Sequence, residues 1–556
     1  MGRKNSSSGI RLKRALFPAL FFAFTIGISI PSEIYFGNEK EFSVGYPDLL
    51  PLILPITAVL FLIGAGIAFL LRKKKNLLLI WLDLLFGGTL AVYLQQNLLN
   101  GELQQLDGAG PSLNTSSTLA LAGMAVWLIC LAGPHILRIL RPRAEALLRR
   151  YGSALLTVTQ IGALAVMIIS SEGPTTTRFS LTKKDEFSIS PSGNIIVFVV
   201  DTLDAQWAET LILDREEYRE TLKDFTYFSN VVAGGAPTVL GMPTLFTGEI
   251  YHPEEGSVNH YMEAAYRKST LFSDLRENGY QVRLYTNNRY LYGANGEEIS
   301  NSAFNYSYRI KYPKKFIKDL YMMTAYKGLP YQLKNPFTVY SGELTGNVLA
   351  EGSAEDRFEL DDAKFYQEFR KKGLTLAGAE KVFTVYHFFG AHGPFSMNEN
   401  GEKVKKAETS RDQQILGVFR IISDYLADMK KQHVYDNSMI VITADHGGRL
   451  LYQNPAVFVK PGGTRQDRLT VRDAPLTFRN LRASFLEEAT GQRNDIYGDG
   501  MFTDNFQTDV LRPHTFSVTL YKRIYGESAE EKYGKAKYLT FQIGNPARDR
   551  DLIVKP

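Results

Sequence analysis

Apolar residues in the first third of the chain fall into five long runs that short polar segments separate. The runs cover residues 15–36, 49–71, 77–94, 118–137 and 152–169. A helix needs roughly 20 apolar residues to cross a hydrocarbon core of about 30 Å. The pattern therefore predicts five transmembrane helices. If the first run were a cleaved signal peptide, four further spans would still keep the protein in the membrane.

Lys and Arg residues are distributed unequally between the two ends of these runs. Fourteen of them lie before the first run, between the second and third, and between the fourth and fifth. The other two loops, residues 31–48 and 95–117, contain a single basic residue, Lys40. Cytoplasmic loops carry the excess of basic residues. We therefore expect a cytoplasmic N-terminus and, after an odd number of spans, an extracytoplasmic remainder.

Two polar side chains, Asp83 and Gln160, lie inside predicted spans. An ionisable group in a span points to a functional site by default. The alternative for Asp83 is a carboxylate packed against another helix or placed near the end of the span.

Beyond residue 171 the pattern becomes that of a soluble α/β protein. Residues 172–193 are polar and contain Gly and Pro, which is typical of a linker. Residues 194–200 form a continuous β-branched run, which predicts a strand buried on both faces. Similar runs cover residues 281–286, 381–388, 438–444 and 456–460, and helix-periodic segments cover 269–277, 410–431 and 476–489. The alternation predicts an α/β sandwich around a mostly parallel central sheet.

The expected organisation is therefore a membrane domain at 1–171, a linker at 172–193, an α/β domain at 194–490 and its C-terminal part at 491–556. That last part has strand-like pieces at 515–521 and 538–544. It could close the edge of the sheet, recognise a partner molecule, or simply pack.

Composition narrows the possible functions. The single cysteine, Cys130, excludes an internal disulfide and a Cys-rich zinc site. The net charge of +5 comes from 63 basic and 58 acidic residues. Much of the basic excess flanks the predicted spans, so we expect no nucleic-acid partner.

Chemistry-bearing residues follow the predicted strands, where ligands bind in parallel sheets. Asp201 follows the strand at 194–200, and Asp445 and His446 follow the strand at 438–444. Two carboxylates and an imidazole at neighbouring strand ends can hold a divalent cation. The alternatives are a helix cap for Asp201 and a simple turn for the Asp-His-Gly segment.

Thr238 follows a Gly/Pro turn and precedes an apolar run that suits a short helix. A hydroxyl at a helix N-terminus faces backbone N–H groups, which suits an anionic phosphoryl group. A bound cation can make such a hydroxyl usable as a nucleophile. The alternative is a plain N-cap.

Histidines are few and unevenly placed. Three of the eight, His387, His392 and His446, fall at predicted strand ends. His392 lies among small residues in a turn, so we expect it in a cleft, where it could protonate a leaving oxygen or bind a phosphate.

This ordered set of motifs resembles the sulfatase-like branch of the alkaline phosphatase superfamily. With five spans in front, the chain further resembles lipoteichoic acid synthases and lipid A phosphoethanolamine transferases. The resemblance implies Thr238 as the nucleophile and His392 as a group that handles substrate or leaving group. It implies metal ligands Asp201, Thr238, Asp445 and His446, and substrate-binding residues His387, Asn288 and Arg289.

Departures from the family refine the expected activity. Sulfatases need Cys or Ser in a Cys/Ser-x-Pro-x-Arg context, whereas this chain has Thr238-Val-Leu-Gly-Met. Sulfate-ester hydrolysis through formylglycine is therefore not expected. Extra Asp and His ligands for a second metal are not evident after His446, so we expect one divalent ion (Mn²⁺, Zn²⁺ or Mg²⁺). The phosphoethanolamine transferases usually have disulfide-linked exported domains, which a chain with one cysteine cannot form. The resemblance therefore favours the lipoteichoic acid synthases.

A lipid donor would explain why such a site stands on membrane helices. The expected function is transfer of a phospho head group from a phospholipid to a cell-envelope glycan or lipid through a phospho-threonine. Two alternatives stay open, namely a membrane-anchored phosphatase or phosphodiesterase and an inactive envelope scaffold. The oligomeric state is not predicted.

Overall fold

The chain folds into two compact units. The first contains Met1–Thr175 and Tyr308–Leu349, and the second contains Thr176–Ser307 and Ala350–Pro556. The computed structural model describes residues 15–39, 42, 44–100, 115, 117–171, 173–174, 177, 179–304, 308–339, 344, 348–350, 357–376, 378, 380–448, 454–492, 498–504, 511–517, 538–543 and 553–554.

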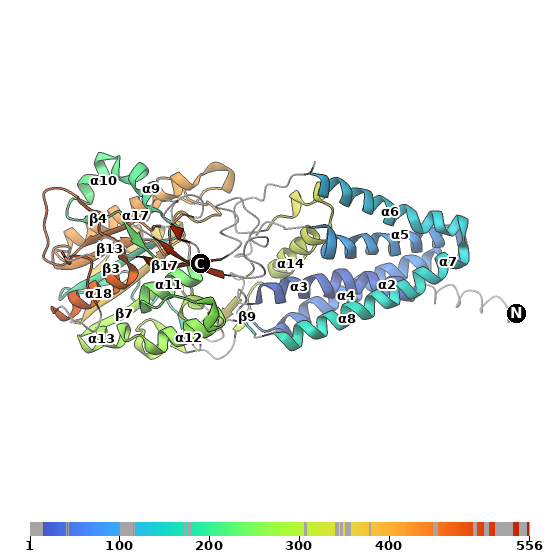
Figure 1. Cartoon of the computed structure of the whole chain (residues 1–556), viewed down its shortest axis with the longest axis horizontal. Helices are drawn as coiled ribbons and strands as arrows, with labels where there is room; N and C mark the ends of the chain where they lie inside the picture. Colours follow the sequence, from blue (N-terminus) through green and yellow to red (C-terminus); the bar gives the residue numbers. More distant parts are fainter. Residues whose placement is uncertain are drawn as a thin grey trace. The chain divides into compact units, whose positions relative to one another are not determined.

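Five helical stretches in the described part of the first unit are long and apolar enough to cross a membrane, as predicted. They are Leu16–Gly37, Tyr46–Lys73, Lys75–Leu99, Thr118–Leu140 and Pro142–Ser170. Their α-helices are α2 (Leu16–Phe24), α3 (Ile30–Gly37), α4 (Tyr46–Leu70), α5 (Lys75–Leu94), α6 (Thr118–Leu140), α7 (Pro142–Leu147) and α8 (Ser153–Ser170). These helices run side by side (Figure 1). Large apolar side chains such as Leu62 and Leu128 stay exposed on them, as suits a lipid environment.

A segment from the middle of the chain joins the first unit. Helix α14 (Pro313–Gly328) buries Phe316 and Leu320 against residues of α3 and α4. The ammonium of Lys327 lies 2.6 Å from a carboxylate oxygen of Glu33. The sequence pattern placed residues 308–349 in the α/β domain. It gave no sign of this packing, because α14 is a short amphipathic helix whose partners lie almost 300 residues earlier in the chain.

The second unit is built around a seven-stranded sheet. Its order is β15 (Thr470–Arg472), β4 (Thr226–Phe228), β14 (Val457–Lys460), β13 (Ser438–Thr443), β3 (Asn194–Val200), β12 (Lys381–Phe388) and β7 (Tyr280–Tyr285). The four strands from β13 to β7 are parallel, whereas β14 runs antiparallel to both of its neighbours. The predicted α/β fold with a mostly parallel sheet is confirmed.

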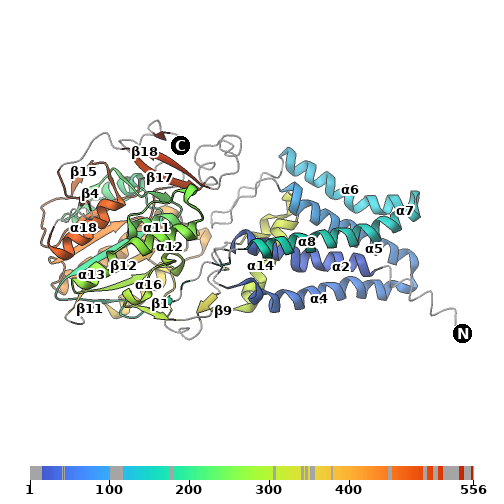
Figure 2. The same ribbon diagram turned by 60° about the horizontal axis from the view of Figure 1, so that its bottom comes forward.

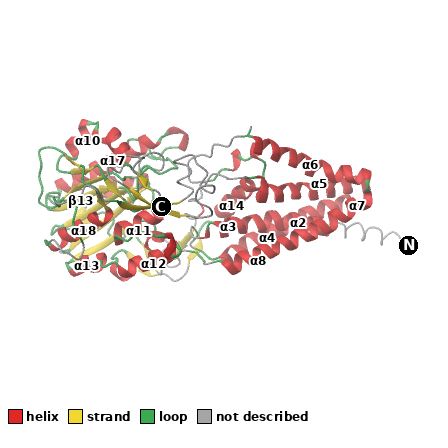
Figure 3. Ribbon diagram, in the orientation of Figure 1, coloured by secondary structure: helices red, strands yellow, loops and turns green. Residues whose placement is uncertain are grey.

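Helices cover both faces of this sheet (Figure 3). Alternate residues of β3 point to opposite faces, and all seven are buried. Ile196 and Phe198 join the core under α16 (Asp362–Lys372) and α17 (Arg411–Lys431). Ile195 and Val197 join the core under α11 (Thr238–Thr247), α13 (Leu271–Glu277) and α18 (Phe478–Thr490). Two cores explain why β3 reads as an unbroken apolar run.

The C-terminal strands form a separate sheet with the order β19 (Ile553–Val554), β18 (Tyr538–Ile543), β17 (Arg512–Ser517) and β6 (Gly235–Ala236). Strands β17 and β18 lie side by side (Figure 2). Because β6 ends two residues before Thr238, the tail pairs with the segment that leads to this residue and does not extend the seven-stranded sheet. The predicted strand residues 518–521 and 544 lie outside the described residues.

Two short strands lie in the range expected as a linker. Strand β1 (Phe179–Leu181) pairs with β8 (Ser302–Phe304), and β2 (Ser188–Ile189) pairs with β11 (Thr375–Leu376). These strands belong to the second unit.

Candidate active site

Three predicted ligands come together where β3 and β13 end. These parallel strands are in register, with Thr443 opposite Val199, so the residues that follow them meet at one edge of the sheet. Asp201, Asp445 and His446 each offer a ligand atom, and these atoms all lie within 4.8 Å of one another. All three residues are buried.

Thr202 ties the two carboxylates together. Its hydroxyl donates to Oδ1 of Asp201 (2.6 Å), and its backbone N–H donates to Oδ1 of Asp445 (2.9 Å). The φ angle of Thr202 is +64°, in the left-handed region that a β-branched residue rarely adopts. Such backbone strain is typical of functional sites. Both bonds use Oδ1 atoms, so Oδ2 of Asp201 and Oδ2 of Asp445 take no part in them.

The remaining ligand atoms fit a divalent cation. Oδ2 of Asp445 and Nε2 of His446 are buried and have no hydrogen-bond partner among the described residues. Nδ1 of His446 lies 2.8 Å from the carbonyl oxygen of Gly447. That contact places the proton on Nδ1 and leaves the Nε2 lone pair free to bind a metal. Oδ2 of Asp445 and Nε2 of His446 lie 3.3 Å from each other. Polar atoms buried without a hydrogen bond are costly, and a cation bound to both would satisfy them.

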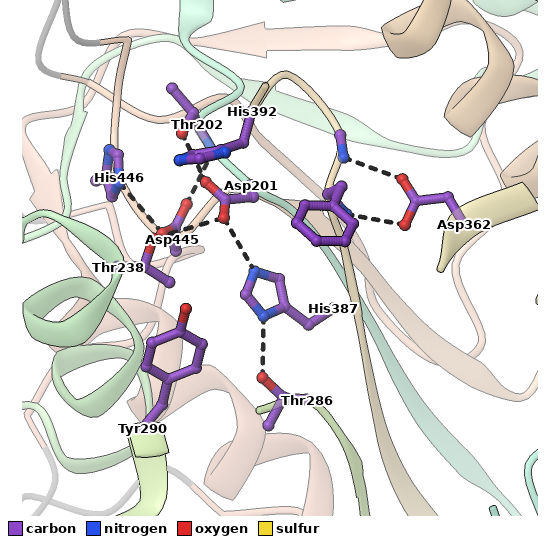
Figure 4. Close-up of polar contacts among 12 residues, drawn as sticks. Asp201, Thr202, Thr238, Thr286, Tyr290, Asp362, His387, His392, Asp445 and His446 are labelled. Carbon is purple, nitrogen blue, oxygen red and sulfur yellow. Dashed lines mark hydrogen bonds and ion pairs between the residues drawn. The ribbon is translucent and has the colours of Figure 1, made fainter. Parts of the chain in front are cut away.

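Thr238 is the first residue of α11, and its N-cap is Pro237. The Thr238 hydroxyl points toward Oδ2 of Asp201 at 3.5 Å (Figure 4). Because Pro237 makes no side-chain cap bond and Thr238 itself lies inside the helix, the structure does not support the plain N-cap. The hydroxyl instead stands at the helix N-terminus beside the three-ligand cluster.

The two histidines after β12 occupy different places around Asp201. Nε2 of His387 lies 3.7 Å from Oδ2 of Asp201, and its Nδ1 lies 2.9 Å from the hydroxyl of Thr286. His387 is buried, whereas His392 is half-buried beside Asp201 (Figure 4). Burial alone would raise the pKa of Asp201, but the imidazoles of His392, His387 and His446 outweigh it and hold that pKa below its ordinary value.

The family model described as Sulfatase matches residues 193–479, a range that includes every residue of this cluster. The chain belongs to the sulfatase family. This confirms the resemblance to the sulfatase-like branch of the alkaline phosphatase superfamily, whose members are enzymes that use divalent metal ions. A search of curated proteins found no match.

Solved structures with a similar fold include both hydrolases and a membrane transferase. Phosphonate monoester hydrolase SpPMH from Silicibacter pomeroyi is 12% identical over 64% of this chain and 87% of its own, with a TM-score of 0.36. An alkaline phosphatase superfamily protein from Vibrio parahaemolyticus is 14% identical over 60% and 74%, with a TM-score of 0.33. The integral membrane lipooligosaccharide phosphoethanolamine transferase A from Neisseria meningitidis is 10% identical over 86% and 95%, with a TM-score of 0.30.

The segment after β7 carries Asn288 and Arg289, which the resemblance implies as substrate-binding residues. The side chain of Asn288 accepts from the backbone N–H of Leu181 (3.1 Å) and donates to Thr177 (3.0 Å), so it holds the β1 region. Arg289 donates to the hydroxyl of Tyr290 (2.9 Å). The Tyr290 hydroxyl faces Thr238 (Figure 4). Of this segment, the ring of Tyr290 lies beside that of His387 (centroids 5.8 Å apart), and Arg289 is bonded to Tyr290.

His514 is a second residue that sequence reasoning missed. It lies on β17, it is fully buried, and neither ring nitrogen has a hydrogen-bond partner in the described part of the chain. Burial, with His446 nearby, lowers the pKa of His514 to about 3, so its ring is neutral. No spacing signal links it to Asp445 and His446, because β17 reaches this region only through pairing with β6.

Proposed function

We propose that this sulfatase-family protein is a membrane-anchored, metal-dependent transferase. It moves a phospho head group, glycerol phosphate or ethanolamine phosphate, from a phospholipid to a cell-envelope glycan or lipid. The observation that carries the proposal is the Thr238 hydroxyl, which points at Asp201 beside the buried Asp–Asp–His cluster. Five membrane-length helices support a lipid donor, because a tethered domain meets lipid head groups at high effective concentration.

The residues present fit one divalent cation (Mn²⁺, Zn²⁺ or Mg²⁺). Asp201, Asp445, His446 and the Thr238 hydroxyl would hold it, and this mixed oxygen and nitrogen set admits all three metals. Bound there, the cation supplies positive charge that favours the alkoxide form of a hydroxyl and offsets the charge on a phosphoryl group.

The first half-reaction transfers the head group to Thr238. His392, which lies close enough to Asp201 to lower its pKa, takes the proton of Oγ1 as Oγ1 forms a bond to phosphorus. The bond between phosphorus and the diacylglycerol oxygen breaks, and His392 protonates that oxygen. The N–H groups at the start of α11 favour the anionic phosphoryl group at this position.

The second half-reaction restores the enzyme. The acceptor hydroxyl gives its proton to His392, which is now neutral, and attacks phosphorus. The bond between phosphorus and Oγ1 breaks, and His392 passes that proton to Oγ1 of Thr238. Water in place of the acceptor would make the same site a phosphodiesterase. The assembled ligand cluster argues against an inactive scaffold.

We further propose that the N-terminus lies in the cytoplasm and the second unit outside the cell membrane. Fourteen basic residues on one side of the five spans against Lys40 on the other support this orientation. It brings the proposed site to the side of the outer-leaflet phospholipids.

The decisive experiment maps Thr238 by peptide mass spectrometry after the purified full-length protein is incubated with divalent metal and a phospholipid mixture. We expect a mass increment equal to glycerol phosphate or ethanolamine phosphate on Thr238, together with released diacylglycerol. The variant Thr238→Ala is the matched control and should give neither product. An unmodified Thr238 without diacylglycerol, in metal-loaded protein, would reject these donors.

A further inference from the structure

The turn at residues 389–393, which carries His392, is fixed to the backbone of Asp201. The N–H of Asp201 donates to the carbonyl of Phe388 (3.0 Å), and the N–H of Ala391 donates to the carbonyl of Asp201 (2.9 Å). Gly390 has φ +54°, and a Cβ at this position would lie 2.9 Å from the backbone nitrogen of Asp201. The turn therefore lies directly against the proposed metal ligand.

Asp362 holds the same turn from the opposite side. Its Oδ1 accepts from the N–H of Phe389 (2.9 Å), and its Oδ2 accepts from the N–H of Gly390 (3.1 Å), as Figure 4 shows. Asp362 is the first residue of α16 and is 6% exposed. No ion pair among the described residues neutralises it. Burying a carboxylate without an ion pair costs free energy, and the two hydrogen bonds to the turn offset part of that cost.

Gln414 of α17 also forms hydrogen bonds with this turn. Its amide nitrogen donates to the carbonyls of Gly390 (2.8 Å) and His392 (3.1 Å), and its amide oxygen accepts from the N–H of Ser396 (2.8 Å). Gln414 is also buried. Two polar side chains from two different helices thus satisfy the backbone on both sides of His392.

We propose that Asp362 and Gln414 are positioning residues of the site, which hold the 389–393 turn so that His392 stays beside Asp201. The importance of His392 rests on the proposed function, but the placement of the turn does not. Asp361 offers a matched control, because its carboxylate caps α16 through the N–H of Lys364 (3.1 Å) and pairs with Lys403, without contacting the turn.

The first test measures the turn without using the natural reaction. The full-length protein is treated with diethyl pyrocarbonate, and carbethoxylation of each histidine is followed by peptide mass spectrometry. In Asp362→Asn we expect His392 to react faster by at least about threefold, because the amide cannot accept from both N–H groups. Exposed His260 is the internal reference, and Asp361→Asn should leave His392 unchanged. Equal His392 rates in Asp362→Asn and the parent would overturn the proposal.

The second test is a double-mutant cycle on Thr238 adduct formation. We expect Asp362→Asn to lower the rate roughly 10- to 100-fold and to cause no further loss in a His392→Ala background, because both changes remove the same contribution. Full additivity would show that Asp362 acts through general stability and would overturn the proposal. Gln414→Ala, which acts from the other side, supplies the same comparison if Asp362→Asn fails to fold. If the parent forms no adduct, the proposed function fails, while the labelling result still decides the position of the turn.

Discussion

Gly241 of α11 lies directly against the backbone of Asp445. A Cβ at residue 241 would overlap the carbonyl oxygen of Asp445 and lie 2.9 Å from its carbonyl carbon. Helix α11 and the loop after β13 therefore approach to backbone contact, one helical turn from Thr238. This contact helps to set the distance between the proposed nucleophile and the ligand cluster.

Gly241→Ala should separate these two segments. Alanine ordinarily stabilises a helix by about 1 kcal/mol relative to glycine, but here its Cβ has no room beside Asp445. We expect at least a tenfold slower Thr238 modification, on the order of 1.4 kcal/mol, and a lower melting temperature. Gly162→Ala in α8 is the control, since nothing lies within 4 Å of its Cβ. Unchanged modification by Gly241→Ala would mean that the close approach has no functional role.

Metal binding should stabilise the fold through the cluster that contains His446. A ligand present at 100 times its Kd stabilises the folded state by about 2.7 kcal/mol. We expect added Mn²⁺ or Zn²⁺ to raise the melting temperature of metal-stripped protein, and His446→Ala to remove most of that increase. The exposed His260→Ala is the control. A metal-induced increase that persists in His446→Ala would place the ion elsewhere.

The sequence was sufficient for the parts of the site that follow buried parallel strands. Asp201 and Asp445 could be found because an unbroken apolar run reveals a strand in a doubly covered sheet, and such strands end at one edge. The five spans were equally visible, because length and apolar content alone predict them.

Other residues could not be found this way, because their roles depend on contacts distant in sequence. Asp362 reads as an ordinary helix-start residue until its carboxylate meets the N–H groups of Phe389 and Gly390. His514 approaches His446 only through the pairing of β17 with β6. Asn288 sits in a segment that resembles a substrate-binding stretch, yet its side chain bonds to residues around β1.

The pH profile should depend on Asp362. The pKa of Asp362 is raised to about 7, chiefly by burial and also by the charge of Asp361. The N–H groups of Phe389 and Gly390 and the neighbouring His387 act in the opposite direction. A raised carboxylate pKa gives stability that is full below the ordinary value of 3.8 and is lost as the pH rises through about 7. Activity should have the opposite sign, because a protonated Asp362 cannot accept from both N–H groups.

We therefore expect Thr238 modification to fall as the pH drops through about 7. Asp362→Asn should be slow throughout and should lose the part of this decline that Asp362 causes. Rates measured from pH 5 to 9 in the parent and in Asp362→Asn test this, and Asp361→Asn should move the decline to lower pH, because the Asp361 charge raises the pKa of Asp362. An unchanged profile shape in Asp362→Asn would assign the decline to another group.

The orientation can be tested with single cysteines in a Cys130→Ser background. Lys74 lies between the second and third membrane-length helices, and Lys268 lies on an exposed face of the second unit. A membrane-impermeant maleimide should label Lys268→Cys on intact cells and should label Lys74→Cys only after permeabilisation. The reverse result would invert the proposed topology.

Asp83 should be a structural group of the membrane unit. Its carboxylate lies 2.6 Å from Nε of Arg138 and 3.2 Å from an amino nitrogen of Arg149, and Arg149 also pairs with Glu145 at 2.8 Å. These contacts join α5 to α6 and to the start of the fifth span, which favours the packed carboxylate over a functional one. Removing one partner of a buried ion pair costs about 3–5 kcal/mol, because the other charges remain buried.

Asp83→Asn should therefore lower the free energy of unfolding by that amount in detergent, while the folded fraction still modifies Thr238 at the parent rate. Asp48→Asn is the control, because Asp48 only caps the exposed start of α4, and it should cost about 1 kcal/mol or less. The two measurements separate the alternatives for Asp83. A stable Asp83→Asn that no longer modifies Thr238 would mean that the carboxylate takes part in function, whereas an unstable but active variant identifies it as the charge that holds these helices together.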